Sequence, residues 1–412
     1  MVKENSRQDE FIILNSQFIG RVPGTGTLFY FIYFLTLHSH YVEMKNLLLF
    51  FFVFTTSLCH AQETGCFKSK PDNDIELQTD IDFSRYNTFF VGEFHGVYGV
   101  SEIKLALIKY LNKNNGITDI FMEIGYSAAW LYNKYLQTGD TSFFTAPFLT
   151  YAQKQPNRDF WKKLYAYNQG LDRKIRIHGM DFERMDFIKA LKLLKPAEKD
   201  KPWQIRETMF YIDTVTMASV NADINDKEHP GEVFNKIYDS IKHDIQVNRD
   251  VYLRYYGAAF YEVEKIMLNE STFEKYKERN ETMYKNMMKE TEEYGITRFI
   301  VFCGLNHADM SNKKKATLCY KLMNNPDYTN SQANITMVCK NCYDWQLQPK
   351  YQHSDFRAPG TYSDDTAMLN EMYKYNFNKS CKYSILPCST VQDKNVQLFS
   401  HYLILMKDQP EF

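Results

Sequence analysis

The chain has 412 residues, which is enough for one large domain with an insertion or for two modest domains. Its 49 Lys and Arg residues balance its 50 Asp and Glu residues, so the chain has no net field that would attract nucleic acid or anionic lipid. We therefore expect no nucleic-acid partner. The 30 Tyr and 31 Phe residues suit a packed interior and a cleft for a small organic substrate.

The first recognisable pattern is MKNLLLFFFVFTTSLCHAQ, which begins at Met44. A Lys, a short apolar run and Ala61 follow in the order of a secretory signal peptide, and the run is too short for a transmembrane helix of about 20 residues. We predict an upstream extension at 1–43 and a signal peptide at 44–61. The alternative is two membrane segments. Export predicts a secreted or periplasmic protein with no stable membrane anchor after cleavage.

Export also changes how the cysteines are interpreted. Seven of the eight cysteines follow the predicted signal peptide, and an odd number leaves at least one of them unpaired. Four of the seven can form either two disulfides or a zinc site, with disulfides favoured in an oxidising compartment. These four are Cys339, Cys342, Cys381 and Cys388.

From residue 82 onward, short apolar runs alternate with helical patterns. Units of strand, helix and strand about thirty residues long predict a parallel sheet. Strands are predicted at 88–94, 117–125, 174–181, 297–310, 335–339 and 401–407. Helices are predicted at 101–114, 128–136 and 160–170, and Asn114, Asn115 and Gly116 are expected to close the first of them.

Strand patterns disappear between about 182 and 294, where long charged helical stretches replace them. We predict a helical insertion here, inside a single α/β domain that spans 62–412. The expected architecture is a mainly parallel central sheet flanked by helices. A lysine run at 313–315 is expected to open a further helix, and His178 is expected to be a buried core histidine.

Polar side chains follow four of the predicted strands, and the carboxyl ends of parallel strands meet at one edge of a sheet. Hydrolysis needs such a set, in which a neutral His takes a proton from water, a carboxylate orients it, and a second His or a cation holds developing negative charge. Two imidazoles and two carboxylates also make a plausible divalent-metal set, namely Glu93, His95, Glu123 and His307. The further candidates are Asp181 and Asn306.

Two common enzyme classes lack their usual support. The sequence has no G-x-S-x-G elbow and no phosphate-binding glycine loop. A serine nucleophile and nucleoside triphosphate hydrolysis are therefore not expected.

The stretch VGEFHGVYGVSEIKLALIKYLNKNNGITDIFMEIG resembles the opening of the erythromycin esterase family. LYNKYLQTGD, HGMDFERM, RNETMYKNM and FCGLNHADM are similar to later family signatures, in the same order. The resemblance covers most of residues 88–310. It implies a fold shared with haem-uptake (ChaN-like) and TIKI-like proteins.

The resemblance implies hydrolysis of an ester or lactone, as in macrolide resistance, by His-activated water and without a required metal. It implies His95 as general base, Glu93 as its partner, and Glu123 and His307 as further site residues. It also makes Arg279 a cation for the oxyanion and Asp181 a supporting residue. No cofactor is expected, with metal and haem left open. The alternatives are a non-enzymatic haem-binding or ligand-binding relative and a metal-dependent hydrolase.

Two residues depart from the family pattern. The family usually has two residues between the Glu and the His, whereas this chain has only Phe94. Asn280 stands where an Asp or Glu is commoner. Both departures concern the substrate more than the fold.

Overall fold

The computed structural model describes residues 64–72, 74–95, 97–143, 155–184, 186–197, 199–215, 232–269, 278–310, 316–328, 330–343, 353–356, 380–390 and 400–408. The chain divides into two compact units, Met1–Gln62 and Glu63–Phe412. All described residues belong to the second unit. The predicted extension, signal peptide and lysine-run helix start lie outside the described residues. No described helix is long and apolar enough to cross a membrane.

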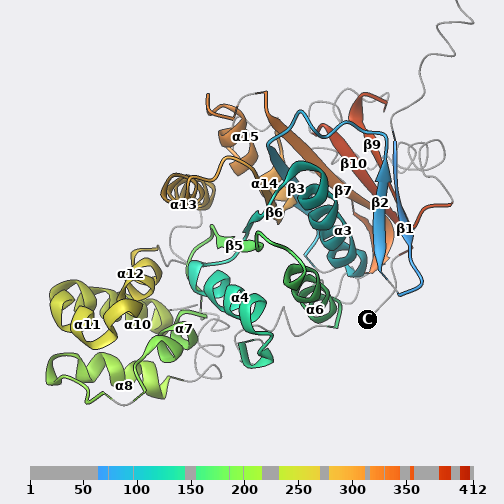
Figure 1. The fold of residues 1–412 in the computed structure, drawn as a ribbon. Coiled ribbons are helices and arrows are strands. Elements are labelled where there is room, and N and C mark those ends of the chain that lie inside the picture. Colours follow the sequence, from blue (N-terminus) through green and yellow to red (C-terminus); the bar gives the residue numbers. More distant parts are fainter. Residues whose placement is uncertain are drawn as a thin grey trace, which may run out of the picture. The chain divides into compact units, whose positions relative to one another are not determined.

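One mixed sheet joins the strands of the described residues (Figure 1). The strands lie in the order β2-β1-β9-β10-β7-β3-β6-β4-β5, and β8 pairs with β7 outside this path. They are β1 (Gly65–Ser69), β2 (Ile75–Thr79), β3 (Thr88–Glu93), β4 (Asp119–Met122), β5 (Arg176–Gly179), β6 (Phe299–Gly304), β7 (Gln332–Tyr343), β8 (His353–Phe356), β9 (Tyr383–Pro387) and β10 (Tyr402–Lys407).

The sheet is parallel in only one part. Strands β10, β7, β3, β6, β4 and β5 pair in parallel, in that order. Strands β2, β1 and β9 continue the sheet with antiparallel pairing, and β8 is antiparallel as well. The predicted α/β class with flanking helices is confirmed, but the mainly parallel sheet is confirmed only in part. The loop between β1 and β2 is too short for the crossover that parallel pairing requires.

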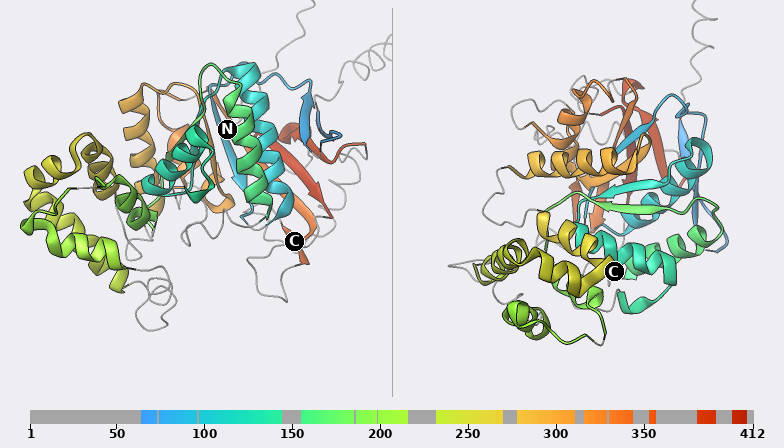
Figure 2. Two further views of the ribbon diagram at one scale, coloured as in Figure 1. Left: turned by 60° about the horizontal axis from the view of Figure 1, so that its bottom comes forward. Right: turned by 60° about the vertical axis from the view of Figure 1, so that its left-hand side comes forward.

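Helices cover both faces of the parallel part. They include α3 (Tyr98–Asn115), α4 (Tyr126–Thr138), η1 (Thr141–Phe143), α6 (Gln155–Gln169), α13 (Arg279–Tyr294), α14 (Leu305–Ala308), α15 (Leu318–Met323) and η6 (Cys388–Thr390). Helices α3 and α6 lie side by side in Figure 2 and share one core cluster with Phe89 and Val91 of β3. Phe90 points to the other face, where it shares a cluster with Met283 and Met287 of α13.

Helix α3 ends where the sequence predicts. Gly116 has φ +67° and its N–H donates to the carbonyl oxygen of Asn112 at 3.1 Å. This left-handed conformation is one that glycine adopts without steric cost, so the chain can leave the helix and enter β4.

A further group of helices shares a core of its own. These are α7 (Asp186–Leu194), η2 (Trp203–Ile205), α8 (Arg206–Thr214), α10 (Glu232–Val247), α11 (Arg249–Tyr256), η3 (Gly257–Ala259) and α12 (Phe260–Leu268). Their core contains the fully buried Tyr238, whose hydroxyl donates to the carbonyl oxygens of Ile266 and Asn269. In the described residues between β5 and β6, every regular element is a helix. The bounds of the insertion itself stay a prediction.

The cysteines pair differently from the four-residue group that the sequence suggests. Cys339 and Cys342 form a disulfide within β7, as one of the two alternatives requires. Cys381 pairs with Cys66 of β1 and not with Cys388, which is a buried free thiol. The favoured disulfide alternative therefore holds for Cys339 and Cys342, and the zinc alternative, which needs all four cysteines, does not hold. The pairing of Cys66 follows from β1 lying beside β9, which their sequence separation of 315 residues conceals.

Loss of the Cys66–Cys381 disulfide is expected to destabilise the protein by about 2–5 kcal/mol, because the bond restricts the unfolded chain. The measurement is the urea-unfolding free energy of a Cys66→Ser/Cys381→Ser variant at neutral pH. The wild type measured under strong reductant serves as the control and should approach the variant. If the variant had the same unfolding free energy as the oxidised wild type, the disulfide would contribute nothing to stability.

Candidate active site

Four neighbouring parallel strands, β3, β6, β4 and β5, end at the same edge of the sheet. Glu93 is the last residue of β3, Glu123 follows β4, and Asp181 lies two residues after β5. His307 follows β6, in the short helix α14. The carboxyl ends of parallel strands share an edge, so these positions converge although they are far apart in sequence.

Glu93 is buried and contacts two potential cations. Lys104 Nζ, from α3, lies 3.1 Å from Oε1 and 2.9 Å from Oε2, and His95 Nδ1 lies 3.5 Å from Oε1. Burial disfavours the carboxylate, but the charge of Lys104 and the contact with His95 outweigh burial and lower the pKa of Glu93. Glu93 is therefore an anion placed to orient the ring of His95.

Glu123 is the common partner of His95, His307 and Arg279. Its Oε2 accepts a hydrogen bond from the backbone N–H of Gly304 at 2.6 Å, and its Oε1 accepts one from Arg279 Nη2 at 2.5 Å. Burial disfavours the charged form, but contacts with His307 and His95 hold the pKa of Glu123 well below its usual range. Glu123 is therefore a fixed negative charge between the two imidazoles.

Arg279 connects the helical part of the chain to the sheet. This first residue of α13 donates to Asp181 in a forked pair, with Nε 3.0 Å from Oδ1 and Nη2 2.6 Å from Oδ2. Asp181 is fully buried and also accepts from Arg184 at 3.0 Å. Because the guanidinium binds Asp181 and Glu123, it holds these carboxylates in place. The predicted role of Arg279 as an oxyanion cation stays a prediction.

The contacts of His307 define which of its nitrogens carries the proton. Arg279 Nη1 lies 3.4 Å from Nε2, and a guanidinium has no acceptor atom, so Nε2 is the acceptor. Nδ1 therefore carries the proton and donates to Asn280 Oδ1 at 2.6 Å. Glu123 Oε1 also lies 3.5 Å from Nε2, so this nitrogen has both a guanidinium and a carboxylate beside it. The guanidinium at Nε2 and the uncharged amide at Nδ1 favour a proton acceptor at this position.

His95 has carboxylates at both ring nitrogens instead. Nδ1 is 3.5 Å from Glu93 Oε1, and Nε2 is 3.5 Å from Glu123 Oε2. Burial lowers the pKa of His95, but the two carboxylates outweigh it and raise the pKa to about 10. His95 is therefore an imidazolium at neutral pH, with 38% of its side chain exposed. Its expected role as a neutral base stays a prediction, and these contacts favour a proton donor.

Gly304 makes the approach of His95 possible. A Cβ atom at this position would lie 2.7 Å from His95 Nε2 and 3.4 Å from Glu123 Oε2. Any side chain here would displace the imidazole. The glycine at the end of β6 is thus part of the site, and its place in FCGLNHADM is the sequence signal for it.

Asn306 is the one predicted site residue that remains apart. It lies in α14 beside His307, but its side chain is exposed and makes no hydrogen bond with another described residue. The one-turn helix directs neighbouring residues to different sides. No role in the cluster follows for Asn306.

Sequence reasoning missed Lys104. Its side chain is only 11% exposed and lies 5.0 Å from the ring centre of Phe302. In α3 the buried residues Val100, Leu107 and Leu111 follow helical spacing, and Lys104 occupies a position on the same stripe. A charge within an apolar stripe is the signal that could have identified it.

The predicted metal set does not fit a metal ion in this arrangement. Lys104 already pairs with Glu93, and Arg279 already pairs with Glu123, where a metal would need the carboxylate oxygens. Within the described ranges, no group of three or more His, Cys, Asp and Glu side chains is arranged to hold a metal ion.

A further buried carboxylate, Glu183, lies two residues after Asp181. It accepts hydrogen bonds from the N–H and hydroxyl of Ser127 and from Asn269 Nδ2 at 2.9 Å. Burial raises the pKa of Glu183 to about 7 despite these hydrogen bonds. The neighbouring Asp186 has its pKa raised to about 7 as well, by burial and by the charge of Glu183.

A pH-dependent stability follows from Glu183. Because the folded-state pKa of about 7 lies above the unfolded value of 4.5, stability is full below about pH 4.5 and declines as pH rises toward 7. The loss is on the order of 3 kcal/mol for this group alone. The Glu183→Gln variant should therefore lose less unfolding free energy than the wild type between pH 5 and pH 8. Urea unfolding at both pH values measures this, with the exposed Glu76→Gln as control; parallel losses in all three proteins would contradict it.

The comparisons with known proteins agree with this geometry at the level of fold. No protein-family model and no curated protein matches the sequence. The chain is similar in structure to a protein from Bacillus cereus, with 15% identity, coverage of 79% of this chain and 89% of that chain, and a TM-score of 0.50. It is also similar to a mutant of the erythromycin esterase EreC in its open conformation, with 12% identity, coverage of 79% and 91%, and a TM-score of 0.52.

A third solved structure, a succinoglycan biosynthesis protein, matches with 13% identity, coverage of 79% and 88%, and a TM-score of 0.49. Identities this low show the fold alone. The predicted resemblance is confirmed as an erythromycin esterase-like fold, and the activity has to be argued from the site.

Proposed function

We propose that this protein is a hydrolase that cleaves an ester or lactone of a small organic substrate with histidine-activated water. The observation that carries the proposal is the unequal pair of histidines around Glu123. His307 has partners that suit a neutral base, and His95 has partners that suit a proton donor. Pairs of titratable groups with opposite preferences are typical of acid–base catalysis.

The proposed reaction begins when water takes the place of the Arg279 N–H at the lone pair of Nε2 of His307. This nitrogen takes a proton from the water as the water oxygen attacks the acyl carbon and a tetrahedral intermediate forms. The bond from the acyl carbon to the leaving oxygen then breaks, and the imidazolium of His95 gives its proton to that oxygen. The products are an acid and an alcohol. The proton gained by His307 returns to His95 through solvent, which restores both residues.

The charged residues around the two histidines stabilise the proton states that this reaction requires. Glu93 and Glu123 hold the proton on His95 until the leaving oxygen acquires negative charge. Lys104 and Arg279 neutralise these carboxylates, so that the cluster does not repel the developing anion. The exposed part of His95 gives the substrate access to an otherwise buried group.

Export to an oxidising compartment is part of the proposal. The signal-peptide pattern at 44–61 supports it, and so does the Cys66–Cys381 disulfide, because such bonds persist outside the cytosol. Among lactone substrates, a macrolide antibiotic is one candidate, supported by the fold shared with EreC.

Turnover of a panel of esters and lactones, macrolides included, tests the proposal. The purified protein should hydrolyse at least one member, and it should do so after treatment with a chelator. His243→Ala, which removes an exposed histidine of α10, is the matched control and should retain full activity. A preparation that hydrolyses nothing in the panel, or one that shows a visible haem band and no turnover, would reject the hydrolase.

A further inference from the structure

A buried histidine outside the candidate active site, His178, joins strand β5 to two other elements. His178 Nε2 lies 3.0 Å from Asp119 Oδ1 at the start of β4, and Nδ1 lies 3.0 Å from Glu290 Oε2 of α13. The imidazole is 1% exposed and stacks on Phe121, with 4.8 Å between ring centres. The predicted burial of His178 is confirmed, but the ring is also a bridge between the sheet and a helix.

The chemistry of this bridge is ionic. A neutral imidazole has one N–H, whereas two carboxylates at 3.0 Å offer only acceptors, so both contacts are satisfied when the ring carries two protons. The carboxylates have further partners. Lys265 pairs with Glu290, and Arg173 lies 3.1 Å from Asp119 Oδ2. The bridge is therefore a closed network in which no carboxylate depends on His178 alone.

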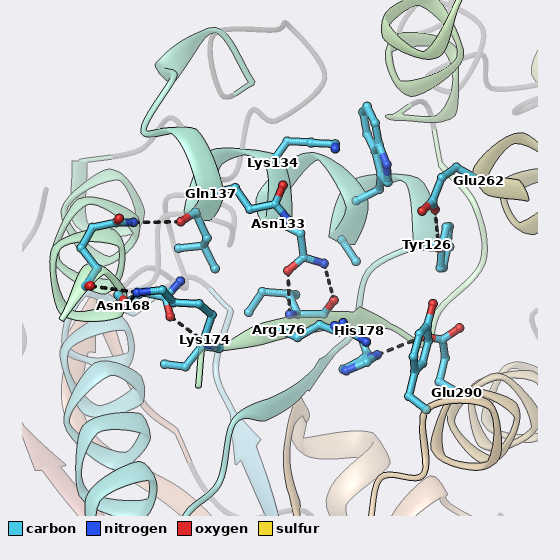
Figure 3. A pocket seen from close by; sticks show the side chains of 17 residues that line it. Tyr126, Asn133, Lys134, Gln137, Asn168, Lys174, Arg176, His178, Glu262 and Glu290 are labelled. Carbon is cyan, nitrogen blue, oxygen red and sulfur yellow. Dashed lines mark hydrogen bonds and ion pairs between the residues drawn. The ribbon is translucent and has the colours of Figure 1, made fainter. Parts of the chain in front are cut away.

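Figure 3 shows His178 and Glu290 pointing toward one another beside a cavity of about 580 Å³ at the free edge of β5. The amide of Asn133 covers this edge, since it accepts from Ile177 N at 2.9 Å and donates to Ile177 O at 2.8 Å. The edge is thus closed to another strand. Helix α13 contacts β5 and the residues directly after it through its side chains.

Three such contacts follow one another in sequence, one from β5 and two from the residues directly after it, and all reach α13. Glu290 binds His178, Asn286 Nδ2 donates to the carbonyl oxygen of Met180 at 3.1 Å, and Arg279 binds Asp181. Positions 279, 286 and 290 lie on one face of a helix with 3.6 residues per turn. The residue number of the helix partner falls from 290 to 279 as that of the residue it contacts rises from 178 to 181. The contacts therefore specify one antiparallel register between the helix and this segment.

We propose that His178 is a positioning residue, which fixes the register of α13 on β5 and thereby places Arg279 and Asn280 against Glu123 and His307. This inference rests on the proposed function for its kinetic consequence. The structural consequence is independent of that function, because the contacts of α13 exist whatever the substrate is.

Amide hydrogen exchange tests the structural consequence without any substrate. In His178→Gln, the neutral side chain cannot donate to both carboxylates, so the bridge between β5 and either β4 or α13 is lost. Amides of α13 should exchange at least about tenfold faster, while those of β3 and β6 keep their wild-type rates. Arg173→Ala removes the exposed partner of the same Asp119 and is the matched control, with no change expected in α13. Unchanged exchange in α13, or an equal increase throughout the protein, would overturn the proposal.

Kinetics on an ester from the panel tests the second consequence. His178→Gln should lower kcat by about 10–100-fold with little change in KM, because Arg279 and Asn280 shift relative to the reacting groups. In an Arg279→Lys background the same substitution should lower kcat by about twofold or less, since the contact through which it acts is already lost. Additive losses would overturn the positioning role.

The outcomes separate the two proposals. Faster exchange in α13 together with a protein that hydrolyses no ester supports the register and rejects the hydrolase. Unchanged exchange in α13 together with an active enzyme supports the hydrolase and rejects the register. If His178→Gln does not fold, Glu290→Gln alters the same contact from the helix and is expected to give the same exchange pattern.

Discussion

Replacement of His307 by alanine is expected to lower kcat/KM for the ester by about 10²–10⁴-fold, the usual contribution of a positioned general base. Its Nε2 is an acceptor held by the Nδ1–H contact to Asn280, and alanine removes that acceptor. The measurement is kcat/KM of the folded variant, with its circular dichroism compared with that of the wild type.

His95→Ala is the companion variant and is expected to lose activity by a similar factor, because it removes the proton donor. A leaving group that needs no proton, such as a nitrophenolate, should restore part of the activity of His95→Ala and none of that of His307→Ala. Full activity in either variant, or equal rescue of both, would contradict the assigned roles.

Replacement of Arg279 by alanine is expected to cost about 3–5 kcal/mol of unfolding free energy, because it leaves the buried Asp181 and Glu123 without their shared cation. Arg184→Ala is the control. It removes a second donor to the same Asp181, but its side chain is 58% exposed, and the expected loss is about 1 kcal/mol or less. Urea unfolding at neutral pH measures both, and equal losses would contradict the distinction.

The Arg279→Lys variant separates charge from geometry. Lysine keeps the positive charge but has no fork with which to bind Asp181 and Glu123 at once. Its stability should fall between those of the wild type and Arg279→Ala, and its kcat should stay well below the wild-type value. Wild-type kcat in Arg279→Lys would show that the charge alone suffices.

The sequence predicted the strand ends because apolar runs that end in polar residues are a local signal. Glu93, Glu123 and Asp181 each follow such a run, and each lies at the expected edge. The neighbour order β3-β6-β4-β5 has no local signal, because β6 inserts between strands that precede it by more than a hundred residues. The contacts among the ends therefore required the structure.

The antiparallel part of the sheet was not predicted from the sequence, for a related reason. Strands β1, β2 and β9 are five residues long each and lack a long apolar run. Their pairing joins residues at opposite ends of the described chain, and the Cys66–Cys381 disulfide crosses the same boundary. Such short strands are specified by their neighbours more than by their own composition.

The proton states of the histidines depend on distances that no sequence pattern contains. The motif FVGEFHG places Glu93 near His95, and this pairing alone suits a neutral base oriented by a carboxylate. The second carboxylate, Glu123, comes from another strand and changes His95 into an imidazolium. Asn280, in place of an acid, gives Nδ1 of His307 an uncharged partner. Several residues that converge at this sheet edge could thus be named from the sequence, whereas Lys104 and the different surroundings of the two histidines could not.

The pH dependence of kcat/KM tests this division of labour most directly. His95 has a pKa of about 10, so an enzyme that uses it as a proton donor should keep a level rate from about pH 8 to pH 9 and lose activity as pH rises through 10. An enzyme that uses His95 as the base should instead gain about tenfold per pH unit up to the same value. A rate that climbs steadily to pH 10 would contradict the proposed roles of His95 and His307.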